Sequence, residues 1–213
     1  PGASLPCRPP YNLAMNSRTR LILAVASLAL LVMYLAPIWS ISLEAPQYPE
    51  GLGLEIWIDT IKGQREHDLN NINNLNHYIG MKRIVPEAIP ELKMMPWIIG
   101  GLVALGLLAA AIGRPWLLYG WTGLFLAIAV VGLVDFYLWE YDYGHNLDTV
   151  NAIIKIPGMS YQPPLIGSKQ LLNFTATSWP ALSGWIAFAS LGAGLYLSYL
   201  QLRTRKQAAP EVA

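Results

Sequence analysis

Charge, cysteine and histidine are all scarce in this chain of 213 residues. Charged side chains make up only 13% of it, roughly half the share of a typical soluble domain, whereas 54% of the residues are hydrophobic. So few polar side chains cannot cover a soluble core. The net charge of +1 lacks the basic excess of a nucleic-acid-binding protein, and a single cysteine excludes a disulfide scaffold, a Cys-based zinc site and a CxxC motif. The composition predicts a membrane protein without a nucleic-acid partner.

Common catalytic motifs are also missing. The chain has no G-x-S-x-G, H-E-x-x-H, P-loop or dinucleotide-binding glycine pattern, so neither ordinary hydrolysis nor group transfer is indicated. All three histidines lie outside the long apolar runs, which excludes a haem held by two histidines within the bilayer. We therefore predict a protein that is not an enzyme and that binds neither haem nor nucleotide.

Four apolar runs come close to the 20 or so residues that one bilayer crossing needs, and they predict transmembrane helices over residues 21–43, 96–112, 117–138 and 180–202. Only residues 113–116 separate the second run from the third, so these two form a tight hairpin. The predicted fold is an all-α membrane protein in which four transmembrane helices form two inside–out–inside hairpins. Two ordered extracytoplasmic loops, residues 44–95 and 139–179, join the helices.

The two ends of the chain are predicted to lie outside the membrane domain of residues 15–202. Residues 1–14 contain four prolines and precede a natural-looking start at Met15, which predicts a disordered or non-native leader. The only cysteine, Cys7, lies there and is assigned no function. The first apolar run is longer than the 7–15 residues typical of a signal peptide, so it is expected to be a retained anchor. Residues 203–213 form a basic cytoplasmic tail.

The charges indicate an orientation. With the N-terminus inside, the cytoplasmic segments hold seven basic residues and one acidic residue, whereas the outer loops with the adjoining helix end hold seven basic and twelve acidic residues. Short positive segments on one side are what the positive-inside rule requires. The predicted location is the bacterial inner membrane, multi-pass, with the N-terminus and the C-terminus both inside. Membrane lipid is therefore an expected partner.

The outer loops contain every histidine and have recognisable local patterns. Residues 52–58 alternate between apolar and other side chains and predict a short strand. Residues 66–81 place four aliphatic side chains on one side of a helix and asparagines with two histidines on the other, which predicts a helix in the same loop. The polar side either contacts an ordered partner or bonds neighbouring backbone. If the third membrane helix continues to residue 143, Asp135, Trp139 and Asp142 share a face.

The two outer loops share the pattern H-[DN]-L-[DN]-x2-N-x6-G-M, at residues 67–81 and 145–159. One hypothesis is a duplicated helix–loop–helix unit, with its halves related by a pseudo-two-fold axis along the membrane normal. The alternative is coincidence, because the matched stretch is short and its flanks do not align at the same offset.

Histidine and methionine together on an outer face are typical of copper sites, because thioether sulfur favours Cu(I) and imidazole suits either oxidation state. The predicted metal ligands are His67, His77, Met81, His145, Met159 and Asp142. His77 and Met81, four residues apart, could share one ion, and the duplication would bring His67 towards Met159 and His145 towards Met81. The alternative is that these are ordinary hydrogen-bonded loop residues.

The segments EHDLNNINNLNHYIGMK, residues 66–82, and IPGMSYQPPLIGSKQLLNF, residues 156–174, resemble an uncharacterised bacterial family of four-helix membrane proteins associated with nitrous oxide reductase gene clusters. The resemblance implies copper handling, or assembly support for an extracytoplasmic copper enzyme, with that enzyme or a copper chaperone as protein partner. The alternative function is a structural membrane subunit that docks a soluble partner through its outer loops. A small transporter is disfavoured because the apolar runs contain only one ionisable residue, Asp135.

Overall fold

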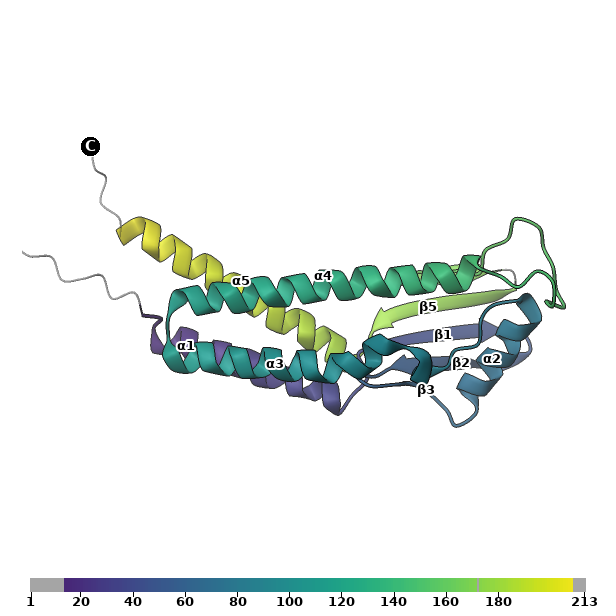
Figure 1. The fold of residues 1–213 in the computed structure, drawn as a ribbon, viewed down its shortest axis with the longest axis horizontal. Coiled ribbons are helices and arrows are strands. Elements are labelled where there is room, and N and C mark those ends of the chain that lie inside the picture. The colour runs from purple at the N-terminus through teal and green to yellow at the C-terminus, as the bar shows by residue number, and fades with distance from the viewer. Residues whose placement is uncertain (1–13, 172, 209–213) are drawn as a thin grey trace, which may run out of the picture.

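The computed structural model describes residues 14–171 and 173–208. Within them, four helices are long and apolar enough to cross a membrane. They run side by side at one end of the molecule, and a sheet lies at the other (Figure 1). The first consists of α1 (Ser17–Ala29) and the 3-10 turn η1 (Leu30–Tyr34), and the others are α3 (Pro90–Ile112), α4 (Pro115–His145) and α5 (Leu182–Ala208). The start of α1 and the end of α5 both lie away from the sheet.

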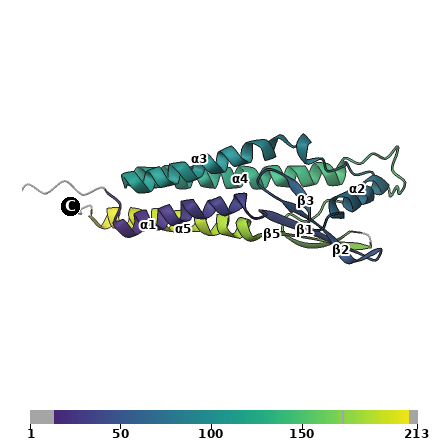
Figure 2. The ribbon, with the colours of Figure 1, turned by 90° about the horizontal axis from the view of Figure 1, so that it is seen from below.

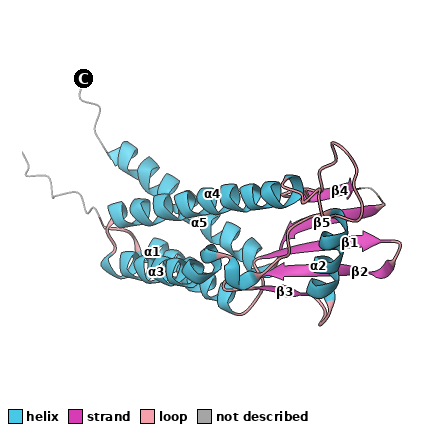
Figure 3. Cartoon of the chain, turned by 45° about the vertical axis from the view of Figure 1, so that its right-hand side comes forward, coloured by secondary structure: helices cyan, strands magenta, loops and turns pink. Residues whose placement is uncertain are grey.

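The prediction of an all-α protein is wrong, because the described residues contain a five-stranded antiparallel sheet. Its order is β3-β2-β1-β5-β4, so β1 joins the strands of the two predicted loops in one sheet (Figure 3). The strands are β1 (Trp39–Ala45), β2 (Tyr48–Ile56), β3 (Ile61–Gly63), β4 (Gly167–Leu171) and β5 (Phe174–Pro180). The strand predicted at residues 52–58 is confirmed over 52–56 as part of β2, which ends at Ile56. The helix predicted within 66–81 is confirmed as α2 (Asp68–Ile79).

The predicted helix over residues 21–43 is in fact a helix followed by a strand. The helix ends at Tyr34, and Pro37 follows in a position that blocks its continuation. From Trp39 the backbone is extended, with Trp39 and Ile41 buried on one face and paired with β2 and β5. The other helices are longer than predicted, since α3 begins at 90, α4 reaches 145 and α5 reaches 208. The predicted helices stop short because each added stretch contains charged side chains, such as Glu91 in α3, Glu140 in α4 and Arg203 in α5.

The sheet is polar on one face and packed on the other. Its inner face joins α2 and the far half of α4 in one apolar core, which includes Trp39, Leu54 and Ile72 with Phe136 and Trp139 packed against them. A second core lies between the membrane-type helices, around Leu23, Leu102 and Leu118. Figure 2 shows α2 and the sheet beyond the helices, with α3 and α4 on one side and α1 and α5 on the other.

Helix α4 belongs to both cores because of its length. Its 31 residues extend about 46 Å at 1.5 Å per residue, whereas a hydrocarbon layer is about 30 Å thick. Its C-terminal end therefore projects past α1, α3 and α5 (Figure 1) and packs against the sheet core through Phe136, Trp139 and Tyr143. The helix does continue past residue 143, the condition under which the sequence placed Asp135, Trp139 and Asp142 on one face. This projecting end is the feature that positions the site described below.

The predicted duplication is wrong, because the two matched segments have different conformations. Residues 68–79 form α2, whereas most of residues 146–159 form turns and irregular loop. The segments contact each other without being equivalent: the backbone N–H of Asp148 donates to the carbonyl of Gly80 at 2.7 Å. Gly80 and Gly158 both have positive φ, 79° and 76°, so the shared glycines reflect two separate turns. The predicted leader lies outside the described residues except for Ala14.

Candidate functional site

The inner face of the sheet, α2 and the end of α4 enclose a cavity of about 440 Å³, here called the sheet cavity. Its walls are apolar side chains from every surrounding element, including Ile41, Leu54, Ile72 and Ala176. A volume of this size falls within the range of small-molecule sites, which are mostly apolar with a few fixed polar groups. The sheet cavity is lined by Ile41, Leu43, Ala45, Gln47, Tyr48, Leu54, Ile72, Leu75, Asn76, Tyr78, Ile79, Met81, Ile84, Trp139, Glu140, Tyr143, Ile154, Tyr161, Pro163, Leu171, Asn173, Phe174 and Ala176.

Two polar side chains in this lining have no hydrogen-bond partner. Glu140 is 0% exposed and neither of its carboxyl oxygens is bonded, and the hydroxyl of Tyr161, a residue 3% exposed, is also unbonded. Among the described residues, three of the four buried side-chain polar atoms that lack a partner belong to these two residues. A buried polar group left unpaired costs about 1–3 kcal/mol, and more if it is charged. Burial also raises the pKa of the Tyr161 phenol.

Hydrogen bonds hold the wall of α2 against the wall of α4. The side chain of Asn73 on α2 is buried, donates to the carbonyl of Ile84 at 3.1 Å and accepts from the N–H of Ile84 at 2.7 Å. Two residues before Ile84, Lys82 forms an ion pair with Asp142 on α4, with 2.5 Å between the Lys82 Nζ and the Asp142 Oδ2. The hydroxyl of Tyr143 donates to the carbonyl of Arg83 at 3.2 Å. Asn73 thus bonds neighbouring backbone, which was one of the two alternatives for the asparagine-rich helix.

The segment between α4 and β4, residues 146–166, covers one end of the cavity. Its Ile154 N–H donates to the carbonyl of Tyr78 on α2 at 2.9 Å, and its Tyr161 N–H donates to the carbonyl of Gly144 on α4 at 2.9 Å. The turn at Asp148 is held by its own carboxylate, which accepts from the side chain of Asn151 at 2.7 Å. That side chain, followed by the Asn151 backbone, holds the pKa of Asp148 below its ordinary value.

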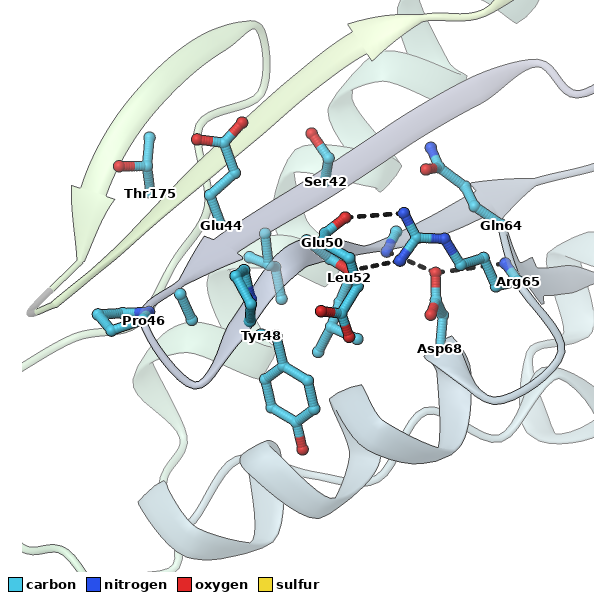
Figure 4. A pocket seen from close by; sticks show the side chains of 15 residues that line it. Ser42, Glu44, Pro46, Tyr48, Glu50, Leu52, Gln64, Arg65, Asp68 and Thr175 are labelled. Carbon is cyan, nitrogen blue, oxygen red and sulfur yellow. Dashed lines mark hydrogen bonds between the residues drawn. The ribbon is translucent and has the colours of Figure 1, made fainter.

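A second pocket, of about 420 Å³, lies beside the β1–β2 turn and has a different character (Figure 4). In this pocket the guanidinium of Arg65 donates to the carbonyls of Glu50 and Gly51 at 2.7 and 3.2 Å. Its buried carboxylate, from Asp68, accepts from the N–H groups of Gly53 and Arg65 at 3.0 and 3.2 Å. These polar groups satisfy one another and fasten the strands to the start of α2, so we assign this pocket a structural role.

The six predicted metal ligands lie at the sheet end in different surroundings. His67 and His77 are exposed, His145 stacks on Tyr141 with ring centroids 4.0 Å apart, and Asp142 pairs with Lys82. Met159 is half-buried in the 146–166 segment. No hydrogen bond, ion pair or ring contact joins any two of the six, and no three His, Cys, Asp or Glu side chains in the described ranges gather as a metal site would require.

His77 and Met81, which could share one ion if they lay on a continuous helix, are placed in different surroundings. Helix α2 ends at Ile79, and Gly80 takes a left-handed conformation, so the four-residue spacing no longer places both side chains on one face. Met81 instead lines the sheet cavity, whereas His77 points to solvent beside Tyr78. The copper site stays a prediction from the sequence, and the structure places Met81 alone of the six in the cavity.

Sequence reasoning missed Glu140 and Tyr161. Glu140 lies between Trp139 and Asp142 at what was predicted to be the start of a solvent-exposed loop, where an acidic residue is unremarkable. Its burial depends on the sheet, which was not predicted. The available signal was Gly144, one helical turn later, which marks a face of α4 that another backbone approaches closely.

Comparison with known proteins gives no further assignment, because no family model and no curated protein sequence matches this chain. The site is therefore interpreted from its own geometry.

Proposed function

We propose that this protein is a membrane-anchored binding protein of the bacterial inner membrane, and that its sheet cavity holds a small, largely apolar ligand on the extracytoplasmic side. The observation that carries the proposal is the fully buried Glu140, which faces an apolar cavity of ligand size without any partner. Native proteins rarely leave a buried carboxyl unpaired unless a function requires it.

The orientation rests on the arrangement of the helices and on charge. Several basic residues lie at the helix ends that point away from the sheet. Arg18 is at the start of α1, Arg114 lies between α3 and α4, and Arg203 is near the end of α5. Because positive segments stay in the cytoplasm, the sheet region and its cavity face outward in this proposal. Anchoring by four helices keeps the cavity next to the bilayer, from which an apolar ligand could be taken up.

Ile154 provides the test, because it lies at the rim of the sheet cavity while its neighbour Ile153 does not line it. Both side chains are exposed, and the backbone N–H groups of both residues donate to the carbonyl of Tyr78. We expect Ile154→Trp to weaken binding of N-phenyl-1-naphthylamine, a neutral environment-sensitive fluorophore, at least about tenfold in lipid nanodiscs. The reason is that the indole occupies part of the cavity. Ile153→Trp should bind the fluorophore as the parent does.

Equal binding by both variants, at a level above that of empty nanodiscs, would place the fluorophore elsewhere on the protein and contradict the proposal. So would a parent protein whose fluorescence does not exceed that of empty nanodiscs. Circular dichroism of each variant confirms that any loss of binding does not reflect unfolding.

A second candidate function is the accessory role predicted from the sequence, in which the outer loops dock a soluble extracytoplasmic partner such as a copper enzyme or copper chaperone. A specific observation favours docking: five aliphatic side chains of the 146–166 segment are exposed, at fractions between 42% and 79%. They are Val150, Ile153, Ile154, Ile156 and Ile166. An exposed apolar patch on a small domain often marks a protein interface.

The copper part of this candidate is tested with the metal alone. If the histidines and methionines handle copper, detergent-purified protein incubated with Cu(I) and desalted should retain about one equivalent of copper by elemental analysis. His77→Ala, His145→Ala and Met159→Ala should each lower that amount. Full retention in all three variants, or none in the parent protein, would remove the copper site.

A further inference from the structure

The sheet cavity has a polar end, and its chemistry restricts the ligand. Glu140 and Gly144 are one helical turn apart on α4 and both are buried, so they share the face that turns toward the cavity. Tyr161 is fastened to the same face, because its N–H donates to the carbonyl of Gly144 at 2.9 Å. Both unpartnered side chains line the cavity, together with the apolar inner face of the sheet, and the backbones that carry them meet at Gly144.

The lining contains one acidic side chain and no lysine, arginine or histidine. An ionised Glu140 would thus be buried without a counterion, which is far more costly than burial of the uncharged carboxyl. A ligand carboxylate would likewise find no cation in the cavity. A cationic ligand could pair with an ionised Glu140, but burial of both charges carries a desolvation cost that their attraction often does not repay. An uncharged ligand that meets an uncharged carboxyl avoids this cost.

An uncharged carboxyl and a phenol each offer one O–H donor. Two donors in one apolar cavity suit a strong acceptor on the ligand, and a carbonyl oxygen can accept both because it has two lone pairs. Given the proposed binding function, on which this step rests, we infer that the ligand is an uncharged lipophilic carbonyl compound of the ketone or quinone class. Its oxygen accepts hydrogen bonds from Glu140 and Tyr161, and its apolar body lies against the sheet.

Four ligands with the same ten-carbon body test the inference: 2-decanone, decane, decylamine and decanoate. Each compound is titrated into the parent protein in nanodiscs, and displacement of N-phenyl-1-naphthylamine is measured. Ile154→Trp protein is titrated in parallel to correct for partitioning into lipid. We expect 2-decanone to displace the fluorophore about tenfold more effectively than decane, as two hydrogen bonds to a buried oxygen imply. Decylamine and decanoate should be weaker than the ketone.

Variants assign the preference to the two residues. Glu140→Gln retains an N–H donor and should keep the preference for 2-decanone, whereas Glu140→Leu combined with Tyr161→Phe should reduce displacement by 2-decanone to the level of decane. The double variant should also melt at a higher temperature than the parent, because two unpaired buried polar groups are gone. A lower melting temperature would indicate a structural role for these side chains and overturn the inference.

The outcomes separate the inference from the proposal beneath it. Tighter displacement by decylamine or decanoate than by 2-decanone, or equal displacement by the ketone and decane, overturns the inference while the cavity remains a binding site. Failure of the fluorophore and of all four compounds to bind the parent protein overturns the binding function itself.

Discussion

Replacing Gly106 with leucine is expected to destabilise the helical half of the protein by about 3 kcal/mol or more, because there is no room for a side chain at this position. Gly106 lies on α3 where α1 and α4 both approach it. A Cβ atom there would collide with the Ser27 hydroxyl of α1 and would lie 2.7 Å from the indole nitrogen of Trp121 on α4. Neither neighbour moves freely, since both are buried and hydrogen-bonded to helix carbonyls at 2.8 and 2.9 Å.

Gly101 supplies the matched control, because it lies on the same helix and a Cβ there meets no atom within 4 Å. Gly101→Leu should leave the melting temperature in detergent within a few degrees of the parent value, whereas Gly106→Leu should lower it by about ten degrees or more. The measurement is thermal unfolding followed by circular dichroism. Similar melting temperatures for the two leucine variants would mean that α1, α3 and α4 do not pack as described.

Local sequence patterns predicted the elements that carry their own period. The alternation after Leu52 predicts a strand, and the aliphatic spacing after Glu66 predicts α2, because each pattern depends only on which side of one element is covered. Both are confirmed. The apolar runs also located the four long helices, since length and hydropathy alone decide whether a helix can cross a membrane.

Hydropathy failed where a helix and a buried strand follow each other. Residues 21–43 contain no charged side chain and are mostly apolar, so hydropathy does not show that the helix gives way to a strand around Pro37. The alternation of Trp39 and Ile41 with Ser40 and Ser42 was the available sign of a strand. Strands β1 and β5 pair across about 135 residues, and no local pattern specifies such a partner.

The candidate site could not be predicted because it depends on that pairing. Glu140 is buried only because the sheet and α2 close around the projecting end of α4. The histidines and methionines, which were predicted from residue type alone, are dispersed over the same region. Residue type identified which chemistry was available, whereas burial identified which side chains the fold had withdrawn from water.

Gly144→Ala is expected to detach the 146–166 segment from α4 and to abolish ligand binding in the sheet cavity. In most helix interiors glycine to alanine is stabilising, by up to about 1 kcal/mol. Here an added Cβ would penetrate the backbone of Gln162 and would lie 2.6 Å from the Cβ of that residue. Backbone cannot rotate away as a side chain can, so the segment must move and take the Tyr161 N–H from the Gly144 carbonyl.

Gly132→Ala on the same helix should leave stability unchanged or raise it, because a Cβ there meets no atom within 4 Å. That control should melt at or slightly above the parent temperature and should bind N-phenyl-1-naphthylamine normally. Gly144→Ala should lose fluorophore binding at least tenfold and show faster amide hydrogen exchange in residues 146–163, while the exchange of α1 and α3 stays unchanged. These changes are expected because the 146–166 segment closes the sheet cavity. That segment can approach α4 closely because Gly144 has no side chain. Normal binding by Gly144→Ala would mean that the segment does not form a wall of the cavity.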